Sequence, residues 1–424
     1  MFGFFISLLL LLTGLVLKRK RGTWISPEVI FCFQWSLVSF LASLHLFGMY
    51  EARDFTWLIV LFGSFSYVLG VLLVSPTKIK SRAEVKDSTP FFNVRTFWFI
   101  TVLLYVFSIQ DFIQAYRFLS VGYDLGEIRL ASYGIEEISG YQRNTAGIYA
   151  LFYAIKDLFR LLMIAVGIHY FTQKPSKNYY YLFAVFGFVF LEASTNGGRF
   201  GFAYLIVELL VCFTLLGNLN RYNRKFKLSK FSLYVPIVAL LSAIVYISVE
   251  RGWDSDAFGV KFYRYICGNI VFFDRHIDNF EGAPLYIVWS SLYGFWSLIL
   301  PVLHTIGLPY PDMYLQAIKE VFDTQNFMQI GDDMYTNAFI TPFYHLYADG
   351  RLVGVILGML IFGIVSGKVY VNARISCNGR NLIFYLIICQ MIFKSITIYP
   401  FAANGYALAL LFFCFFKKRS FNIF

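Results

Sequence analysis

The distribution of apolar residues is the dominant pattern in this chain. Apolar runs of about 17–25 residues recur from one end to the other, and short polar segments separate them. Runs of this length predict transmembrane helices rather than the amphipathic helices of a soluble core. We place the predicted spans, eleven in all, at 2–17, 28–49, 56–74, 97–115, 145–171, 179–195, 200–216, 232–248, 351–370, 382–398 and 405–416.

The basic residues give these predicted spans an orientation. Lys18–Arg21 ("KRKR") follows the first span at once, whereas a cleavable signal peptide carries its positive charge before the apolar stretch. We therefore expect a retained first helix with its N-terminus outside. Alternation from there puts most of the 36 Lys and Arg residues in the loops 18–27, 75–96, 172–178, 217–231, 368–381 and 417–424. The positive-inside rule predicts that these loops are cytoplasmic.

Composition agrees with a membrane protein. The 424-residue chain is 58% hydrophobic and 14% charged, whereas soluble proteins average about 25% charged residues. The formal net charge of +11 does not indicate nucleic acid, because the basic excess lies in the predicted cytoplasmic loops. We predict an all-α polytopic membrane protein that forms one integral membrane domain over 1–424, with the lipid bilayer as a partner and no nucleic acid.

The segment 284–308 tests this topology, because it is apolar enough to span. If it crossed the membrane, every later loop would change sides and the basic tail would lie outside. We therefore expect it to lie on the membrane surface or to dip into it. It then forms part of one large extracytoplasmic loop over 249–350, with interfacial or re-entrant segments.

Sequence motifs for cofactors are absent. The chain has no Walker loop, no GxGxxG and no GxSxG, and its cysteines and histidines lack metal-ligand spacing. We expect neither a metal nor an organic cofactor. A reaction catalysed by this chain would use energy stored in its substrate or in an ion gradient.

The chemically useful side chains concentrate in the extracytoplasmic stretch 249–281. It contains five basic residues among many aromatics: Arg251, Lys261, Arg264, Arg275 and His276. Guanidinium groups bind phosphate or pyrophosphate through two parallel hydrogen bonds, and aromatic faces suit sugar rings. The alternative is a solvated loop whose charges pair with neighbouring carboxylates.

Arg199 occupies a very short predicted hairpin within "STNGGRFGF", Ser194 to Phe202. Gly197 and Gly198 let the backbone turn tightly or approach a ligand, and the next span adds the positive end of its dipole. We predict that Arg199 binds an anion at the rim of the membrane. The alternatives are an interfacial anchor that snorkels to water and an ion pair with Glu192.

Charged residues also occur inside the fifth predicted span. Lys156, Asp157 and Arg160 are three and four residues apart, so they share a helix face. Charges at this depth usually face a bundle interior or a cavity. Lys156 and Arg160 are therefore candidate substrate-binding residues, and a self-neutralising structural cluster is the alternative.

Four glycines lie in the ninth predicted span. Gly354 and Gly358 form one GxxxG pattern, and Gly363 and Gly367 form a second. Such patterns predict close packing of helices in a membrane rather than ligand binding.

Several stretches resemble the Wzy-type oligosaccharide repeat-unit polymerases of bacterial surface polysaccharide pathways. The first is "NGGRFGF", and the second is "YRYICGNIVFFDRHI" from Tyr263 with "SSLYGFWSL" from Ser290. The third is "MYTNAFITPFYHLYADGRLVG", Met334 to Gly354. The chain departs from the family pattern at Asp349-Gly350, where a phenylalanine often separates the two residues.

The resemblance implies an enzyme with a GT-C-like glycosyltransferase architecture in the bacterial cytoplasmic (inner) membrane. Such enzymes join two polyprenyl-pyrophosphate-linked oligosaccharides on the extracytoplasmic face, without nucleotide, metal or other cofactor. A chain-length regulator protein is the protein partner that it implies.

The resemblance also implies roles for individual residues. Arginines stabilise the departing pyrophosphate, and His276, Asp274 or Asp278 acts as the base. The candidate catalytic residues are Arg199, Arg251, Arg264, Arg275 and His276. The candidate substrate-binding residues are Lys156, Arg160, Tyr263, Tyr335, Tyr344 and Asp349.

Two other classes remain open. A ligase of related architecture would transfer the finished glycan to another acceptor such as the lipid A core. A flippase or transporter of lipid-linked oligosaccharides would favour two pseudo-repeated halves. The chain shows no internal repeat, and the 249–350 loop is large and unpaired. The sequence therefore favours the polymerase.

Overall fold

The computed structural model describes residues 1–76, 91–123, 127–128, 148–173, 177–196, 198–220, 230–250, 255–337, 339–376 and 378–416. The chain divides into two compact units. Unit 1 comprises Met1–Arg82, Phe258–Ser376 and Met391–Cys414, and unit 2 comprises Ala83–Ala257, Cys377–Gln390 and Phe415–Phe424.

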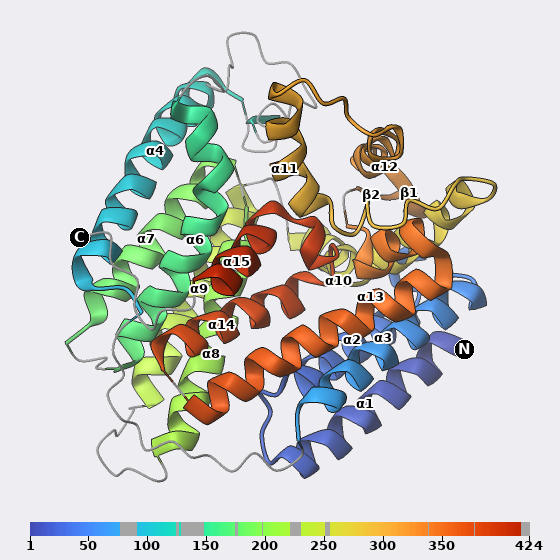
Figure 1. The fold of residues 1–424 in the computed structure, drawn as a ribbon, viewed down its shortest axis with the longest axis horizontal. Coiled ribbons are helices and arrows are strands. Elements are labelled where there is room, and N and C mark those ends of the chain that lie inside the picture. Colours follow the sequence, from blue (N-terminus) through green and yellow to red (C-terminus); the bar gives the residue numbers. More distant parts are fainter. Residues whose placement is uncertain are drawn as a thin grey trace. The chain divides into compact units, whose positions relative to one another are not determined.

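Unit 1 combines the first segment of the chain with segments from its second half (Figure 1). Its N-terminal elements are α1 (Phe2–Arg21), α2 (Pro27–Ala42), η1 (Leu46–Gly48) and α3 (Asp54–Val74). Its middle elements are α10 (Ser255–Ile277), η2 (Asp278–Phe280), α11 (Tyr293–Thr305), α12 (Asp312–Asp323), β1 (Met328–Gly331) and β2 (Met334–Thr336). It ends with α13 (Thr341–Ser376), η3 (Pro400–Ala402) and α15 (Asn404–Phe415). The two strands form a short antiparallel hairpin.

Unit 2 is built from helices in its described part. They are α4 (Val94–Val121), α6 (Ile148–Gln173), α7 (Tyr179–Asn196), α8 (Phe200–Asn220), α9 (Lys230–Glu250) and most of α14 (Gly379–Lys394). The helices α4, α6 and α7 pack against one another, and α8 packs on α6 and α9.

Each predicted apolar span overlaps with a described helix. Among the described residues, four helices are long and apolar enough to cross a membrane: Phe2–Arg21, Asp54–Val74, Val94–Val121 and Thr341–Ile375. Shorter apolar helices cover Pro27–Ala42, Tyr179–Thr195, Phe200–Leu215, Tyr234–Val249 and Asn404–Phe415. The two remaining predicted spans coincide with α6 and α14. The prediction of an all-α membrane protein is confirmed at this level.

The second span ends earlier than its apolar residues suggest. We predicted a span over 28–49, but α2 ends at Ala42. His45 and Phe47 then adopt positive φ angles of 48° and 58°. An α-helix cannot continue through such residues, so hydrophobicity alone extended the prediction too far.

The segment 284–308 contains a short helix. Its helix, α11, has 13 residues and a length of about 20 Å, whereas the hydrocarbon core is about 30 Å thick. Because α15, which we assign to a predicted span, has only 12 residues, helix length alone does not decide this point, and the placement of the segment in the outer loop stays a prediction.

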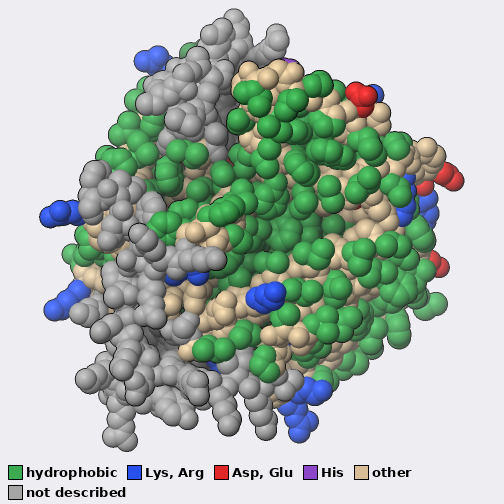
Figure 2. Space-filling model, viewed as in Figure 1, with side chains coloured by type: hydrophobic (Ala, Val, Ile, Leu, Met, Phe, Trp, Pro, Cys, Tyr) green, Lys and Arg blue, Asp and Glu red, His purple; other side chains and the backbone are tan. Residues whose placement is uncertain are grey.

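The helices of unit 1 present apolar side chains on their outer surface. Phe4, Leu8 and Leu12 lie four residues apart on α1 and are 52%, 45% and 51% exposed. The spacing puts them on one stripe of the helix. Figure 2 shows hydrophobic side chains over much of the visible surface of the described residues. A surface of this kind suits contact with lipid tails.

Close packing of α3 against α13 holds the first and last parts of unit 1 together. A Cβ atom on Gly70 would overlap with the backbone oxygen of Leu360. A Cβ atom on Gly363 would likewise overlap with the backbone oxygen of Tyr67. The two backbones therefore meet only because both positions are glycine, as the GxxxG pattern in this span predicted.

The substitution Gly363→Ala should destabilise unit 1. The added methyl group meets backbone, which cannot move aside, so the free energy of unfolding should fall by roughly 1–3 kcal/mol. Thermal unfolding of the purified protein in detergent measures this loss. Gly259→Ala on α10 is the matched control, because its Cβ would meet no atom within 4 Å. Equal melting temperatures for the two variants would contradict the packing argument.

Candidate functional site

A buried polar cluster lies where the first turns of α13 meet the segment before α11. The Asp349 carboxylate accepts hydrogen bonds from the backbone N–H groups of Ser290 at 2.9 Å and Ser291 at 2.8 Å. The Ser290 hydroxyl lies 2.9 Å from Nδ1 of His345. Asp349 is only 3% exposed, so these hydrogen bonds replace water around its carboxylate. Asp349 therefore fixes the turn that leads into α11.

The helix α13 contains a break directly after Asp349. Gly350 has φ −156° and ψ 24°, and Arg351 has φ 54° and ψ −143°. Glycine adopts the second conformation readily, whereas residues with a Cβ adopt it rarely and at a cost of about 1–3 kcal/mol. The break separates a short helical segment, 341–349, from the long apolar part of α13. Such strain persists only where surrounding contacts impose it.

The side chain of Arg351 supplies those contacts. Its guanidinium group donates to the carbonyl oxygens of Tyr347 and Ala348, each at 3.3 Å, at the end of the short segment. It also donates to the carbonyl oxygens of Phe280 at 2.8 Å and Ala283 at 2.7 Å. Arg351 thus caps one helical segment and fastens it to the residues that follow α10.

His276 lies in the interior of unit 1, next to Tyr344. Its Nδ1–H donates to the carbonyl oxygen of Phe272 at 2.8 Å. Its ring packs edge to face against the Tyr344 ring, with 5.9 Å between the ring centres. Burial lowers the pKa of His276, so the imidazole is held in its neutral form. The Tyr344 hydroxyl donates to the carbonyl oxygen of Glu320 at 3.2 Å. A neutral imidazole is the form that a general base requires.

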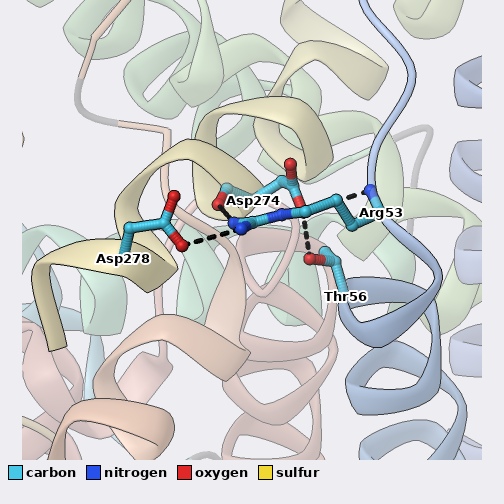
Figure 3. Close-up of polar contacts among 4 residues, drawn as sticks. All are labelled: Arg53, Thr56, Asp274 and Asp278. Atoms are coloured by element: carbon cyan, nitrogen blue, oxygen red, sulfur yellow. Dashed lines mark hydrogen bonds and ion pairs between the residues drawn. The ribbon is translucent and has the colours of Figure 1, made fainter. Parts of the chain in front are cut away.

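The two carboxylates near His276 are already engaged by Arg53 (Figure 3). The Asp274 carboxylate accepts from the Arg53 backbone N–H at 3.2 Å, from its Nε at 3.1 Å and from the Thr56 hydroxyl. The Asp278 carboxylate accepts from the Arg53 guanidinium at 2.7 Å, and this bond raises the pKa of Arg53. The arrangement joins the start of α3 to the end of α10. It favours a structural role for Asp274 and leaves His276 as the better candidate base.

Arg264 and Arg275 lie on the same side of α10. They are 11 residues apart, which is about three helical turns, or about 16 Å along the axis. Arg264 donates to the carbonyl oxygen of Tyr335 at 2.8 Å, and Arg275 stacks over the ring of Tyr50 at 5.0 Å. Neither arginine forms an ion pair with a carboxylate among the described residues. Both guanidinium groups can therefore accept an anion.

Two of the tyrosines that we predicted to bind substrate differ in their surroundings. The Tyr263 hydroxyl donates to the Leu41 carbonyl oxygen at 2.7 Å and accepts from the Leu46 N–H at 3.1 Å. It therefore ties α10 to the end of α2. Tyr335, on β2, is 47% exposed, and its ring is accessible for stacking.

The charged residues of the fifth predicted span form a network of ion pairs within unit 2. Lys156 lies 3.2 Å from Glu192 and 3.7 Å from Asp111. Arg160 lies 3.2 Å from Asp157 and 3.6 Å from Glu192. The network connects α4, α6 and α7. This geometry is the one expected of a self-neutralising cluster, and an anionic ligand at Lys156 would compete with Glu192.

Arg199 immediately precedes α8 in unit 2. Its guanidinium donates to the Ser248 hydroxyl on α9 at 2.9 Å, and its side chain is partly exposed. Its carbonyl oxygen begins the hydrogen-bonding of α8 by accepting from Phe202. Arg199 thus lies at the N-terminus of α8, where we predicted it. Arg251, the remaining candidate arginine, lies outside the described residues.

Within the described residues, no group of three or more His, Cys, Asp or Glu side chains could hold a metal ion. No family model, no curated protein and no solved structure matches the chain. The functional interpretation therefore depends on its own residues.

Two residues of the site were not anticipated. Arg53 could have been noticed because it begins a span that directly follows an outer loop, and Arg351 because it follows the Asp349-Gly350 step. Their partners lie more than 60 residues away in sequence, at Asp274 and Phe280. Spacing along the chain therefore gave no indication of these contacts.

The strained backbone at Arg351 predicts an unusual order of stability between two variants of this residue. Arg351→Ala and Arg351→Gly both lose the guanidinium contacts, but only glycine relaxes the backbone. Arg351→Gly should therefore be more stable than Arg351→Ala by about 1–3 kcal/mol. Chemical denaturation followed by tryptophan fluorescence measures the difference. At a regular helical position alanine is the more stable residue, so that order at 351 would contradict the strained conformation.

Proposed function

We propose that this protein is a membrane glycosyltransferase that polymerises polyprenyl-pyrophosphate-linked oligosaccharide repeat units. The product is a surface polysaccharide, an O-antigen or a capsule. In this proposal eleven helices cross the bacterial cytoplasmic membrane in a GT-C-like architecture. The active site lies on the extracytoplasmic face, and a chain-length regulator protein is a partner.

The observation that carries the proposal is the position of Arg264 and Arg275. Two arginines without carboxylate partners among the described residues lie on one side of α10. Arg275 lies over the ring of Tyr50, whereas Arg264 lies over the ring of Tyr265 and donates to the backbone carbonyl oxygen of Tyr335. Guanidinium groups suit pyrophosphate, and exposed aromatic rings suit sugars. Because about three helical turns separate the arginines, they favour two anions over a single pyrophosphate. A polymerase handles two lipid-linked substrates, each with its own pyrophosphate.

The stretches that carry the family resemblance support the same site. The stretch that ends at Gly354 meets two others in unit 1. Its Asp349 contacts Ser290, which begins the stretch "SSLYGFWSL", and its Tyr344 contacts His276, which lies in the stretch that begins at Tyr263. Residues far apart in sequence are thus brought together at one end of α13.

The proposed reaction is an attack of a sugar hydroxyl of one substrate on the anomeric carbon of the other. The glycosidic bond forms as the bond to pyrophosphate breaks, and the polyprenyl pyrophosphate leaves with both electrons of that bond. Neutral His276 takes up the hydroxyl proton. The arginines stabilise the charge that develops on the leaving group.

The proposed topology predicts the accessibility of single cysteines. In a cysteine-free background, Asp323→Cys on α12 should react from outside with a membrane-impermeant maleimide. Lys177→Cys, which is also exposed in the structure, should react only after the membrane is permeabilised. The reverse pattern would put the Arg264 and Arg275 site on the cytoplasmic side and contradict the proposal.

The proposed anion site predicts a large loss of activity in Arg275→Ala. Removal of one preorganised donor should lower polymer formation on the order of a hundredfold, and Arg275→Lys should recover only part of it. The measurement is polymer length on gels, from cells that contain equal amounts of each protein. Arg264→Ala should behave in the same way. Arg117→Ala, at an exposed position of α4, is the matched control.

Wild-type polymer from Arg264→Ala and Arg275→Ala at normal protein levels would contradict this site. The lipid-linked glycan pool of a deletion strain separates the functional classes. Single repeat units that accumulate outside indicate a polymerase. Full-length unligated chains indicate a ligase, and units retained on the cytoplasmic face indicate a flippase.

A further inference from the structure

Unit 2 contains a carboxyl group that the proposed reaction does not use. Glu208 on α8 and Gln390 on α14 face each other, and both residues are fully buried. The Gln390 side-chain nitrogen donates a hydrogen bond to Oε1 of Glu208. A single contact thus joins two helices whose residues are 182 positions apart in sequence.

The other oxygen on each side chain has no partner. Neither Oε2 of Glu208 nor Oε1 of Gln390 forms a hydrogen bond within the described part of the chain. Glu208 also forms no ion pair with any described Lys, Arg or His. Glu192 on the neighbouring helix α7 differs in this respect, because it lies against both Lys156 and Arg160.

An ionised carboxylate in this position would be very unfavourable. An isolated charge in an apolar interior loses its hydration without compensation, so such a group takes up a proton instead. The Cys389 thiol on α14 is a titratable group close to Glu208, and it carries no positive charge in either of its protonation states.

We propose that Glu208 and Gln390 form a proton-binding site, in which Glu208 is a neutral carboxylic acid. The proton resides on Oε2 and is donated to Oε1 of Gln390, while the Gln390 amide continues to donate to Oε1 of Glu208. This cyclic acid–amide pair uses the two atoms that otherwise lack partners. Small rotations about the terminal side-chain torsions, which are soft, bring them together.

The ligand of this site is a proton rather than a metal ion. The two side chains offer few oxygen atoms, and the described residues contain no cluster of three or more acidic, His or Cys ligands. Hard cations such as Ca²⁺ and Mg²⁺ require about six oxygen ligands. The inference does not depend on the proposed polymerase activity, because it concerns only the charge of one side chain in unit 2.

Infrared spectroscopy of the intact purified protein in detergent tests the proposal. Glu208→Gln should fold like the wild type, because glutamine has the shape of the neutral acid and retains both hydrogen bonds. It should lose one carbonyl band of a protonated carboxylic acid. Glu192→Gln is the matched control and should leave that band unchanged, because Glu192 is ion-paired. Gln390→Leu should shift the band to higher wavenumber, because the acid loses its partner.

Three results would overturn the proposal. If the Glu208→Gln spectrum retains the whole protonated-carboxyl signal, Glu208 is ionised. If Glu208→Gln fails to fold, the site requires a negative charge. If sodium or potassium ions raise the melting temperature of the wild type but not of Glu208→Gln, the site binds a metal cation.

Discussion

The contact between α3 and α13 is the interaction on which the described arrangement of unit 1 depends. Gly70 and Gly363 allow the two backbones to touch, and this fixes a helix from the first part of the chain beside one from the last. The polar contacts of the candidate site follow from it. Arg53 precedes α3 and reaches Asp274, while Arg351 lies in α13 and reaches Phe280. Both arginines therefore hold α10 and the residues after it against this helix pair.

Both units contain ion pairs, but two arginines of unit 1 contact backbone carbonyl oxygens instead of carboxylates. In unit 2, Lys156 and Arg160 lie close to Glu192, so opposite charges compensate one another among helices. In unit 1, Arg351 is surrounded by backbone carbonyl oxygens, and Arg264 contacts one as well. A guanidinium group held by neutral acceptors keeps its full charge and its field. An anion added beside such an arginine would not have to displace a described carboxylate.

Hydrophobicity was sufficient to predict the apolar helices, because a long apolar run has few alternatives to a helix in a membrane. It did not predict α10 and α12, which lie in the predicted outer loop. It also failed at the end of α2, where His45 and Phe47 adopt positive φ angles that no hydrophobic pattern reveals. The candidate site was predicted less completely. The residue types near Arg264 and His276 indicated anion binding and proton transfer, but the Arg53 and Arg351 contacts join distant segments. A single sequence does not specify which segments will meet.

The positions of Arg264 and Arg275 on one helix have a geometric consequence. A helix turns by about 100° per residue, so one inserted residue between them would rotate Arg275 a quarter of the way around α10. Substitutions in 265–274, where most side chains are buried, change the packing of this helix but leave the angle between the arginines intact. That angle therefore depends on the number of residues in the segment and not on their identity.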